Sequence, residues 1–179
     1  MKNINFNNIN SISGFSDIKN VKDFFLPEVC FAGRSNVGKS SLINAVLNRK
    51  KVASISSKPG HTKKIFFYSI DNYFSLVDLP GYGYARTAKL VSKKLSSLIF
   101  SYLSESKMLL KVFLLIDSRH GIKKNDVEFL YLLKDLGLKY QLIFTKSDKA
   151  TNNIKSNTNS LSDIIETDLP IIFSSTKTK

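Results

Sequence analysis

The chain has 179 residues, of which 42% are hydrophobic, and a formal net charge of +13 from 27 Lys and Arg against 14 Asp and Glu. This length and composition are typical of one globular domain with a sizeable core. No apolar run approaches the roughly 20 residues of a membrane span, the N-terminus lacks the apolar segment of a secretion signal, and the single cysteine excludes an internal disulfide. We therefore expect a cytoplasmic protein that does not associate with membranes.

The positive charge has two explanations that the composition leaves open. One is attraction to a polyanion, for which nucleic acid is the obvious candidate. The other is a bias toward lysine in which the extra side chains only solvate the surface. The basic residues are spread along the chain, so no single nucleic-acid-binding helix is indicated.

Residues 1–25 are polar and rich in asparagine, and we expect a partly flexible N-terminal arm there, followed by one domain over residues 26–179. Strand and helix patterns alternate in that domain, which predicts an α/β fold. The expected strands are 28–32, 64–70, 73–77, 110–117, 140–144 and 170–173, and the expected helices are 39–48, 87–104, 124–136 and 159–167. Because Asp71-Asn72 forms a tight turn between two of these strands, we expect a doubly wound, mostly parallel six-stranded sheet with one antiparallel strand and helices on both faces.

The first chemical motif lies between the first strand and the first helix and fits G-x-x-x-x-G-K-[ST]. Gly33 and Gly38 allow the backbone to curl so that several N–H groups point at one anion. Lys39 supplies a positive charge for the outer phosphates of a nucleotide, and Ser40 offers a hydroxyl to Mg²⁺. The whole motif is a candidate nucleotide site: Gly33, Arg34, Ser35, Asn36, Val37, Gly38, Lys39 and Ser40.

Two segments farther along the chain are suited to the γ-phosphate and its metal. Asp78 follows a strand and can hold Mg²⁺ through water, and the N–H of Gly81 can contact the γ-phosphate. Thr62 can give Mg²⁺ a second hydroxyl when the γ-phosphate is present. The metal candidates are thus Ser40, Thr62 and Asp78, and the further nucleotide candidates in these segments are Gly60, His61, Lys63, Lys64, Leu79 and Pro80.

The segment Thr145-Lys146-Ser147-Asp148 follows an apolar strand and fits [NT]-K-x-D. A carboxylate at Asp148 can accept two hydrogen bonds from guanine, a pair of donors that adenine lacks. Lys146 can lay its aliphatic stem along the plane of the base. The segment Ser174-Ser175-Thr176-Lys177 follows the last expected strand, which ends at Phe173, and is placed to steady the base. Phe173, Ser174 and Ser175 are therefore further nucleotide candidates.

These motifs, in this order, resemble the EngB (YsxC, YihA) family of bacterial ribosome-biogenesis GTP-binding proteins, which belong to the TrmE-Era-EngA-YihA-Septin-like P-loop GTPases. The most specific blocks are G-R-S-N-V-G-K-S-S at 33–41 and D-L-P-G-Y-G-Y-A at 78–85. The resemblance implies a P-loop GTPase domain that binds GTP, GDP and Mg²⁺ as a monomer. It also implies a switch in large ribosomal subunit assembly, with the subunit precursor and rRNA as partners, and a requirement for normal septation.

The chain departs from the family pattern at two places. It ends at Lys179, where the family usually continues with a glycine and a closing C-terminal helix, so we expect a domain without that helix. It also has His61 where the family commonly has arginine, so no role of that side chain is carried over.

Hydrolysis by this site is expected to be slow. Tyr82 follows Gly81 at the position where many GTPases have a water-orienting glutamine, and a phenol cannot reproduce the paired donor and acceptor of an amide. The catalytic candidates are Lys39, Thr62 and Asn36, and the resemblance allows K⁺ as a bound cation near Asn36.

Two other functions stay open on the sequence. One is a GTP-controlled binding module for cell-division proteins without a ribosomal role. The other is a P-loop ATPase, against which Asp148 argues. Arg119 and His120, in the loop after a strand, are interpreted as residues satisfied by local hydrogen bonds rather than as catalytic or RNA-binding groups.

Overall fold

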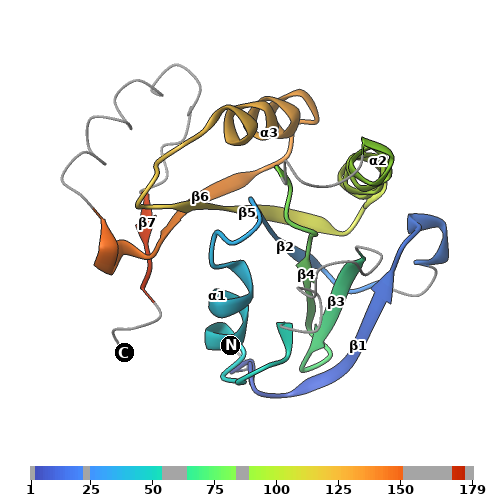
Figure 1. Ribbon diagram of the computed structural model, residues 1–179. Helices are drawn as coiled ribbons and strands as arrows, with labels where there is room; N and C mark the ends of the chain where they lie inside the picture. Colours follow the sequence, from blue (N-terminus) through green and yellow to red (C-terminus); the bar gives the residue numbers. More distant parts are fainter. Residues whose placement is uncertain (1–2, 22–24, 54–63, 84–88, 151–170, 176–179) are drawn as a thin grey trace.

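The computed structural model describes residues 3–21, 25–53, 64–83, 89–150 and 171–175. Its elements in chain order are β1 (Ile9–Phe15), the 3₁₀ helix η1 (Ile18–Asn20), β2 (Glu28–Gly33), α1 (Lys39–Val46), β3 (Ile65–Ile70), β4 (Phe74–Asp78), α2 (Lys89–Glu105), β5 (Leu109–Asp117), α3 (Lys124–Asp135), β6 (Tyr140–Thr145), the 3₁₀ helix η3 (Ser147–Lys149) and β7 (Ile172–Phe173) (Figure 1). The helix expected at 159–167 lies outside the described residues.

One sheet organises the molecule, with the strand order β1-β3-β4-β2-β5-β6-β7. Strand β3 runs antiparallel to both of its neighbours, and the other pairs are parallel. The mostly parallel sheet with one antiparallel strand is therefore confirmed. The turn between β3 and β4 is also confirmed, because Asp71 and Asn72 both have positive φ, 51° and 56°, as a tight hairpin turn requires.

The expected count of six strands is wrong, since the sheet described here has seven. The additional strand is β1, which lies in the segment expected to be an N-terminal arm and pairs with β3 from Ile9↔Ile70 to Phe15↔Ile65. Because β1 lies at the edge of the sheet, it has a neighbouring strand on one side only. Such a strand can have a mixed polar sequence that resembles a loop. Its pairing with β3, the packing of Ile9 on the core and the contact of Phe15 with Phe67 (ring centroids 5.7 Å apart) distinguish it from a loop.

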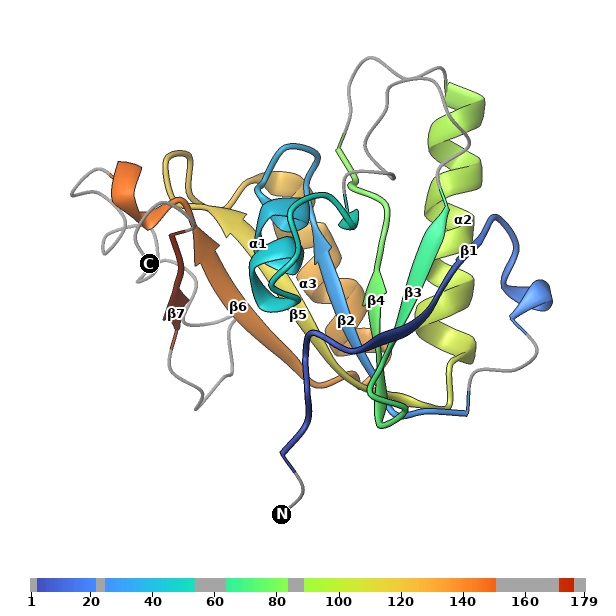
Figure 2. The same cartoon turned by 90° about the horizontal axis from the view of Figure 1, so that it is seen from below.

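Helices cover both faces of the sheet, as expected: α1 lies on one face and α2 and α3 lie on the other (Figures 1 and 2). Ile43 and Leu47 pack with sheet residues on the α1 face, and Tyr102 and Leu133 belong to the core on the opposite face. The central strands β2 and β5 are nearly continuous apolar runs because they are buried on both sides. No described helix is both long enough and apolar enough to cross a membrane.

The parallel strands bring their carboxyl ends to one edge of the sheet. Gly33 ends β2, Asp78 ends β4, Asp117 ends β5 and Thr145 ends β6. Ligands of open α/β sheets bind at this edge, where the strand order changes direction. Residues that are far apart in the sequence are thereby placed within reach of a single ligand.

Candidate nucleotide-binding site

The loop between β2 and α1 has the backbone geometry of an anion-binding turn. Asn36 and Gly38 have positive φ, 65° and 106°, and the N–H of Val37 donates to the carbonyl of Arg34 (3.1 Å). A Cβ on Gly33 would lie 2.9 Å from the carbonyl oxygen of Leu115, so this position accepts only glycine without rearrangement. Because α1 begins directly after Gly38, the loop also lies at the positive end of a helix.

Two of the predicted ligands, Lys39 and Asp78, form an ion pair in this structure. The strand order explains this contact, because β2 and β4 are parallel neighbours and Asp78 lies opposite Phe31. That end of β2 leads through the loop to Lys39, the first residue of α1. The side chains are only 10% and 1% exposed. Ser40 is the next residue of α1 and is half-buried beside this pair. Hydroxyl and carboxylate oxygens are the ligand types that Mg²⁺ prefers, so Ser40 and Asp78 suit that ion chemically.

The segment after Asp78 lies directly against the phosphate loop. The N–H of Ser35 donates to the carbonyl of Tyr82 (3.1 Å), and the hydroxyl of Ser35 donates to the carbonyl of Gly81 (3.3 Å). A Cβ on Gly81 would lie 2.9 Å from the Cα of Ser35, so the close approach depends on glycine. Leu79 is buried and Pro80 is half-buried. The backbone of Gly81 is therefore packed against Ser35 of the phosphate loop.

The side chains of Tyr82 and Arg34 both point to α3. The Tyr82 hydroxyl donates to Oδ1 of Asp126 (2.9 Å), and its ring stacks on Phe129 with centroids 4.8 Å apart. Burial, with the nearby Asp126 carboxylate, raises the pKa of the Tyr82 phenol well above its usual range. Arg34 places Nε 3.0 Å from Oδ2 of Asp126, so its guanidinium contacts α3, while its backbone belongs to the predicted nucleotide loop.

The base-side loop that begins at Thr145 contacts the phosphate loop on the side away from Gly81. The hydroxyl of Thr145 lies within hydrogen-bond distance of the carbonyl of Val37 (2.6 Å), and Nζ of Lys146 donates to the carbonyl of Asn36 (2.7 Å). The last motif joins them, since the hydroxyl of Ser175 donates to Oδ1 of Asp148 (2.8 Å). The N–H of Ser147 donates to the carbonyl of Ser174 (3.1 Å), and Phe173 packs on Phe144 with ring centroids 5.6 Å apart.

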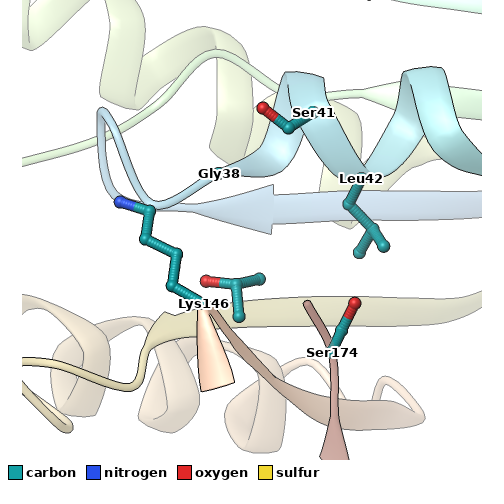
Figure 3. A pocket seen from close by; sticks show the side chains of 6 residues that line it. Gly38, Ser41, Leu42, Lys146 and Ser174 are labelled. Atoms are coloured by element: carbon teal, nitrogen blue, oxygen red, sulfur yellow. The ribbon is translucent and has the colours of Figure 1, made fainter. Parts of the chain in front are cut away.

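A small cavity lies where these motifs meet (Figure 3). It is lined by Gly38, Ser41, Leu42, Thr145, Lys146 and Ser174. Ser41 and Leu42 were not predicted to line a site, although they follow the G-K-[ST] motif on the first turn of α1, which faces the base-side loop. Gly60, His61, Thr62 and Lys63 lie outside the described residues, and Lys64 is exposed just before β3.

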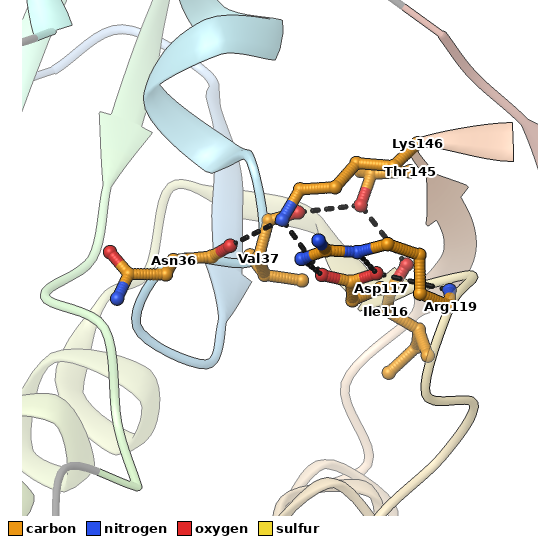
Figure 4. Close-up of polar contacts among 7 residues, drawn as sticks. All are labelled: Asn36, Val37, Ile116, Asp117, Arg119, Thr145 and Lys146. Carbon is orange, nitrogen blue, oxygen red and sulfur yellow. Dashed lines mark hydrogen bonds and ion pairs between the residues drawn. The ribbon is translucent and has the colours of Figure 1, made fainter. Parts of the chain in front are cut away.

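Asp117 was missed by the sequence reasoning as a member of this site. Its Oδ2 accepts from Nζ of Lys146 (2.7 Å) and from Nη2 of Arg119 (2.7 Å), and its Oδ1 accepts from Nε of Arg119 (3.0 Å) (Figure 4). Arg119 is therefore satisfied by a local partner, as expected for that residue. The signal that could have revealed Asp117 is its position, because it ends a buried strand at the same edge as Asp78 and Thr145.

A phosphate loop, a carboxylate at the end of the neighbouring strand and a base-side loop, joined at one edge of this sheet, define a P-loop GTPase. A family model described as "50S ribosome-binding GTPase" matches residues 28–146. The chain is 49% identical over 145 residues to the "Probable GTP-binding protein EngB" of Wolbachia pipientis wMel, an alignment that covers 80% of this chain and 74% of that protein. The chain belongs to the EngB family of GTP-binding proteins.

Solved structures agree with this assignment. A probable GTP-binding protein engB has a TM-score of 0.68 and 29% identity, covering 84% of this chain and 89% of that one. Era in complex with MgGDPNP and nucleotides 1506–1542 of 16S ribosomal RNA has a TM-score of 0.59 and 21% identity, covering 86% of this chain and 52% of that one. At this low identity, the likeness to Era concerns the fold.

Proposed function

We propose that the protein is a Mg²⁺-dependent GTP-binding switch with slow GTP hydrolysis, which acts in large ribosomal subunit assembly and is required for normal septation. The proposal that the protein binds a nucleotide is supported by three motifs that lie together at one edge of the sheet: the phosphate loop, the segment that begins at Asp78 and the base-side loop. Lys39 and Asp78 lie on one side of the phosphate loop, and Lys146 lies on the other with its amine on the loop's own backbone.

In this proposal, the ion pair of Lys39 and Asp78 opens when a nucleotide binds. Lys39 would then face the outer phosphates, and Asp78, Ser40 and Thr62 would hold Mg²⁺, Asp78 through water. The ion supplies neutralisation of phosphate charge when bound. The N–H of Gly81 contacts the γ-phosphate, so that the segments around Gly81 and Thr62 respond to GTP and not to GDP.

Slow turnover is supported by the position of Tyr82. Its hydroxyl is occupied by Asp126 and its ring by Phe129, so the residue after Gly81 supplies no water-orienting group. The remaining catalytic candidates are Lys39, Thr62 and Asn36, the last through a bound K⁺. Hydrolysis rates measured in potassium and in sodium salts test that ion, and equal rates would exclude it.

The ribosomal part rests on the description of the matching family model and on the charge of +13. A basic surface is attracted to the phosphates of rRNA, and this attraction weakens as salt displaces it. We propose that the protein acts as a cytoplasmic monomer, with GTP or GDP and the large-subunit precursor as its partners. A binding module for cell-division proteins is the alternative that the following experiment separates.

The test is co-sedimentation with ribosomal particles at several salt concentrations. The form bound to a non-hydrolysable GTP analogue should sediment with large-subunit particles more than the GDP form does, and salt should release it. Replacing Lys63 and Lys64 together by alanine should weaken this association. It should also reduce the salt slope by about one unit for each rRNA phosphate that the variant no longer binds.

The matched control replaces Lys107 and Lys139 by alanine. These exposed lysines precede β5 and β6 at the opposite edge of the sheet, so the same loss of charge should leave the nucleotide-dependent part of the association unchanged. Equal association of the GTP and GDP forms, or no effect of salt, would contradict the ribosomal proposal. Retention by division proteins in a pull-down would then favour the alternative.

A further inference from the structure

The carboxylate of Asp117 occupies the middle of the nucleotide edge. It ends β5, which lies between β2, the strand that leads into the phosphate loop, and β6, the strand that leads into the base-side loop. The residue is 4% exposed. Its main-chain carbonyl accepts from the N–H groups of His120 and Gly121 (3.0 Å each), which closes the following turn without using the side chain. Both carboxylate oxygens are therefore available to other partners.

Those partners are two cations from different elements. Arg119 binds the carboxylate with a fork, through Nε to Oδ1 (3.0 Å) and Nη2 to Oδ2 (2.7 Å), and its N–H also donates to Oδ1 (3.0 Å). Lys146 donates from Nζ to Oδ2 (2.7 Å). A planar fork on both oxygens leaves the carboxylate one orientation, so Arg119 determines where the oxygen that receives Lys146 lies.

The side chain of Lys146 is held at both ends. Its backbone has a positive φ of 55°, which sets the direction in which the side chain leaves the chain, and its amine is bound to Asp117 and to the carbonyl of Asn36 (2.7 Å each). The aliphatic stem is stretched between these points and borders the cavity beside Gly38 and Ser174 (Figures 3 and 4). A lysine stem ordered in advance loses little conformational freedom when a ligand lies on it.

The charge state of Asp117 favours its contact with the amine of Lys146. Burial raises the pKa of its carboxyl, but the hydrogen bonds from Arg119 and Lys146 outweigh burial and hold that pKa well below its usual range. The group is therefore a carboxylate at neutral pH, as the salt bridge to Lys146 requires.

We propose that Asp117 is a positioning residue for guanine nucleotides: with its orientation set by Arg119, it anchors the amine of Lys146 so that the lysine stem forms a preordered shelf for the base. The inference rests on the proposed function, in which that stem lies along the guanine plane. It adds a residue outside the nucleotide motifs, contributed by β5, to the determinants of nucleotide affinity.

The test measures two ligands on the full chain, GDP and inorganic tripolyphosphate, each with Mg²⁺. The Asp117→Asn variant keeps the size of the side chain but loses the charge that binds Lys146. Its Kd for GDP should rise about tenfold or more, mainly through faster dissociation, as expected for the loss of a charged hydrogen bond. Its Kd for tripolyphosphate, which has no base, should stay unchanged.

A second pair of variants tests whether Asp117 acts through Lys146. Lys146→Met keeps a stem without the amine, so Asp117→Asn should have no further effect on GDP affinity in that background. Arg119→Gln, a change at an exposed side chain, should raise GDP dissociation severalfold and provides a variant that does not remove a buried group. Asp135→Asn, an exposed carboxylate at the far end of α3, is the matched control and should behave as the wild type.

Three results would overturn the inference. These are an unchanged GDP affinity in Asp117→Asn, an equal loss for GDP and tripolyphosphate, and an undiminished effect in the Lys146→Met background. An unchanged GDP affinity in Asp117→Asn would not contradict the proposed function, provided that the wild type binds GDP in the same assay. Absence of GDP binding by the wild type would overturn the proposed function as well.

Discussion

At the scale of single residues, the central feature is the ion pair of Lys39 and Asp78. Under the proposed function the two groups would bind an outer phosphate and a metal-bound water, and in this structure they neutralise each other. Both are buried, and a buried charge without a partner is unfavourable. The pair therefore stabilises this part of the fold, and under the proposed function nucleotide and Mg²⁺ would supply equivalent charges in its place.

Lys39→Ala should consequently lower the free energy of unfolding as well as abolish most triphosphate binding. Removal of one partner from a buried pair costs about 3 kcal/mol, and urea denaturation would measure it. The double variant Lys39→Ala with Asp78→Asn should recover much of the stability but none of the binding. Full stability in Lys39→Ala alone would contradict the stabilising role of the pair.

The second prediction at this scale concerns the base. Asp148→Asn should weaken GTP binding and improve the binding of xanthosine triphosphate, because an amide donates to the carbonyl that xanthine has in place of guanine's exocyclic amine. Competition titrations with GTP, ATP and xanthosine triphosphate would measure the change. A variant that kept its guanine preference would remove Asp148 from the base site.

At the scale of elements, the carboxylate of Asp126 connects α3 to the phosphate loop and to Tyr82. Asp126, in the first turn of α3, is fully buried and accepts from the Tyr82 hydroxyl and from the backbone N–H of Lys123 (2.9 Å each). It also pairs with Arg34 of the phosphate loop. Tyr82 is thus held between the phosphate loop and α3, so under the proposed function a displacement of the neighbouring Gly81 would reach α3.

Tyr82→Phe tests this element directly. The phenyl ring keeps the stack on Phe129 but removes the hydrogen bond to Asp126, which should lower the free energy of unfolding by about 1 kcal/mol. Single-turnover GTP hydrolysis should change little, because the hydroxyl is directed to α3. A large loss of rate with unchanged stability would mean that the hydroxyl takes part in hydrolysis.

At the scale of the whole molecule, the sheet separates a ligand edge from a structural edge. At the structural edge, Glu28 begins β2 and is 3% exposed, and its Oε2 accepts from the hydroxyls of Tyr102 (2.9 Å) and Ser106 (2.7 Å). Burial raises the pKa of Glu28 above its ordinary value, although both hydrogen bonds act in the opposite direction. This network joins the C-terminal end of α2 to the sheet, far from the phosphate loop.

The raised pKa has a consequence for stability. Because the folded protein binds the Glu28 proton more tightly than the unfolded chain does, its contribution is fully present below the ordinary pKa of 4.5 and is lost as pH rises through the raised value. The unfolding free energy of the wild type, relative to Glu28→Gln, should therefore fall over the pH range that begins at 4.5 and ends above the raised pKa. Urea titrations across this range would measure it, and a constant difference would contradict the raised pKa.

The sequence alone was sufficient to predict the α/β sheet with its antiparallel strand, the phosphate loop and the family. These depend on residue types at short, regular spacing, since a loop such as Gly33–Ser40 binds phosphate through its own backbone. The sequence also indicated Asp148 and Lys146 as base-side residues, because they follow a buried strand directly. It failed for β1, whose mixed polar sequence becomes a strand only against β3.

Only the tertiary structure decided the contacts between elements. The approach of Lys146 to Asp117, and of Arg34 and Tyr82 to Asp126, depends on which strands and helices are neighbours and on their register. A carboxylate after a strand looks the same in the sequence whether it faces solvent or a lysine 29 positions away. The strength of an ion pair depends on distance and burial in space, neither of which is encoded at a fixed sequence separation.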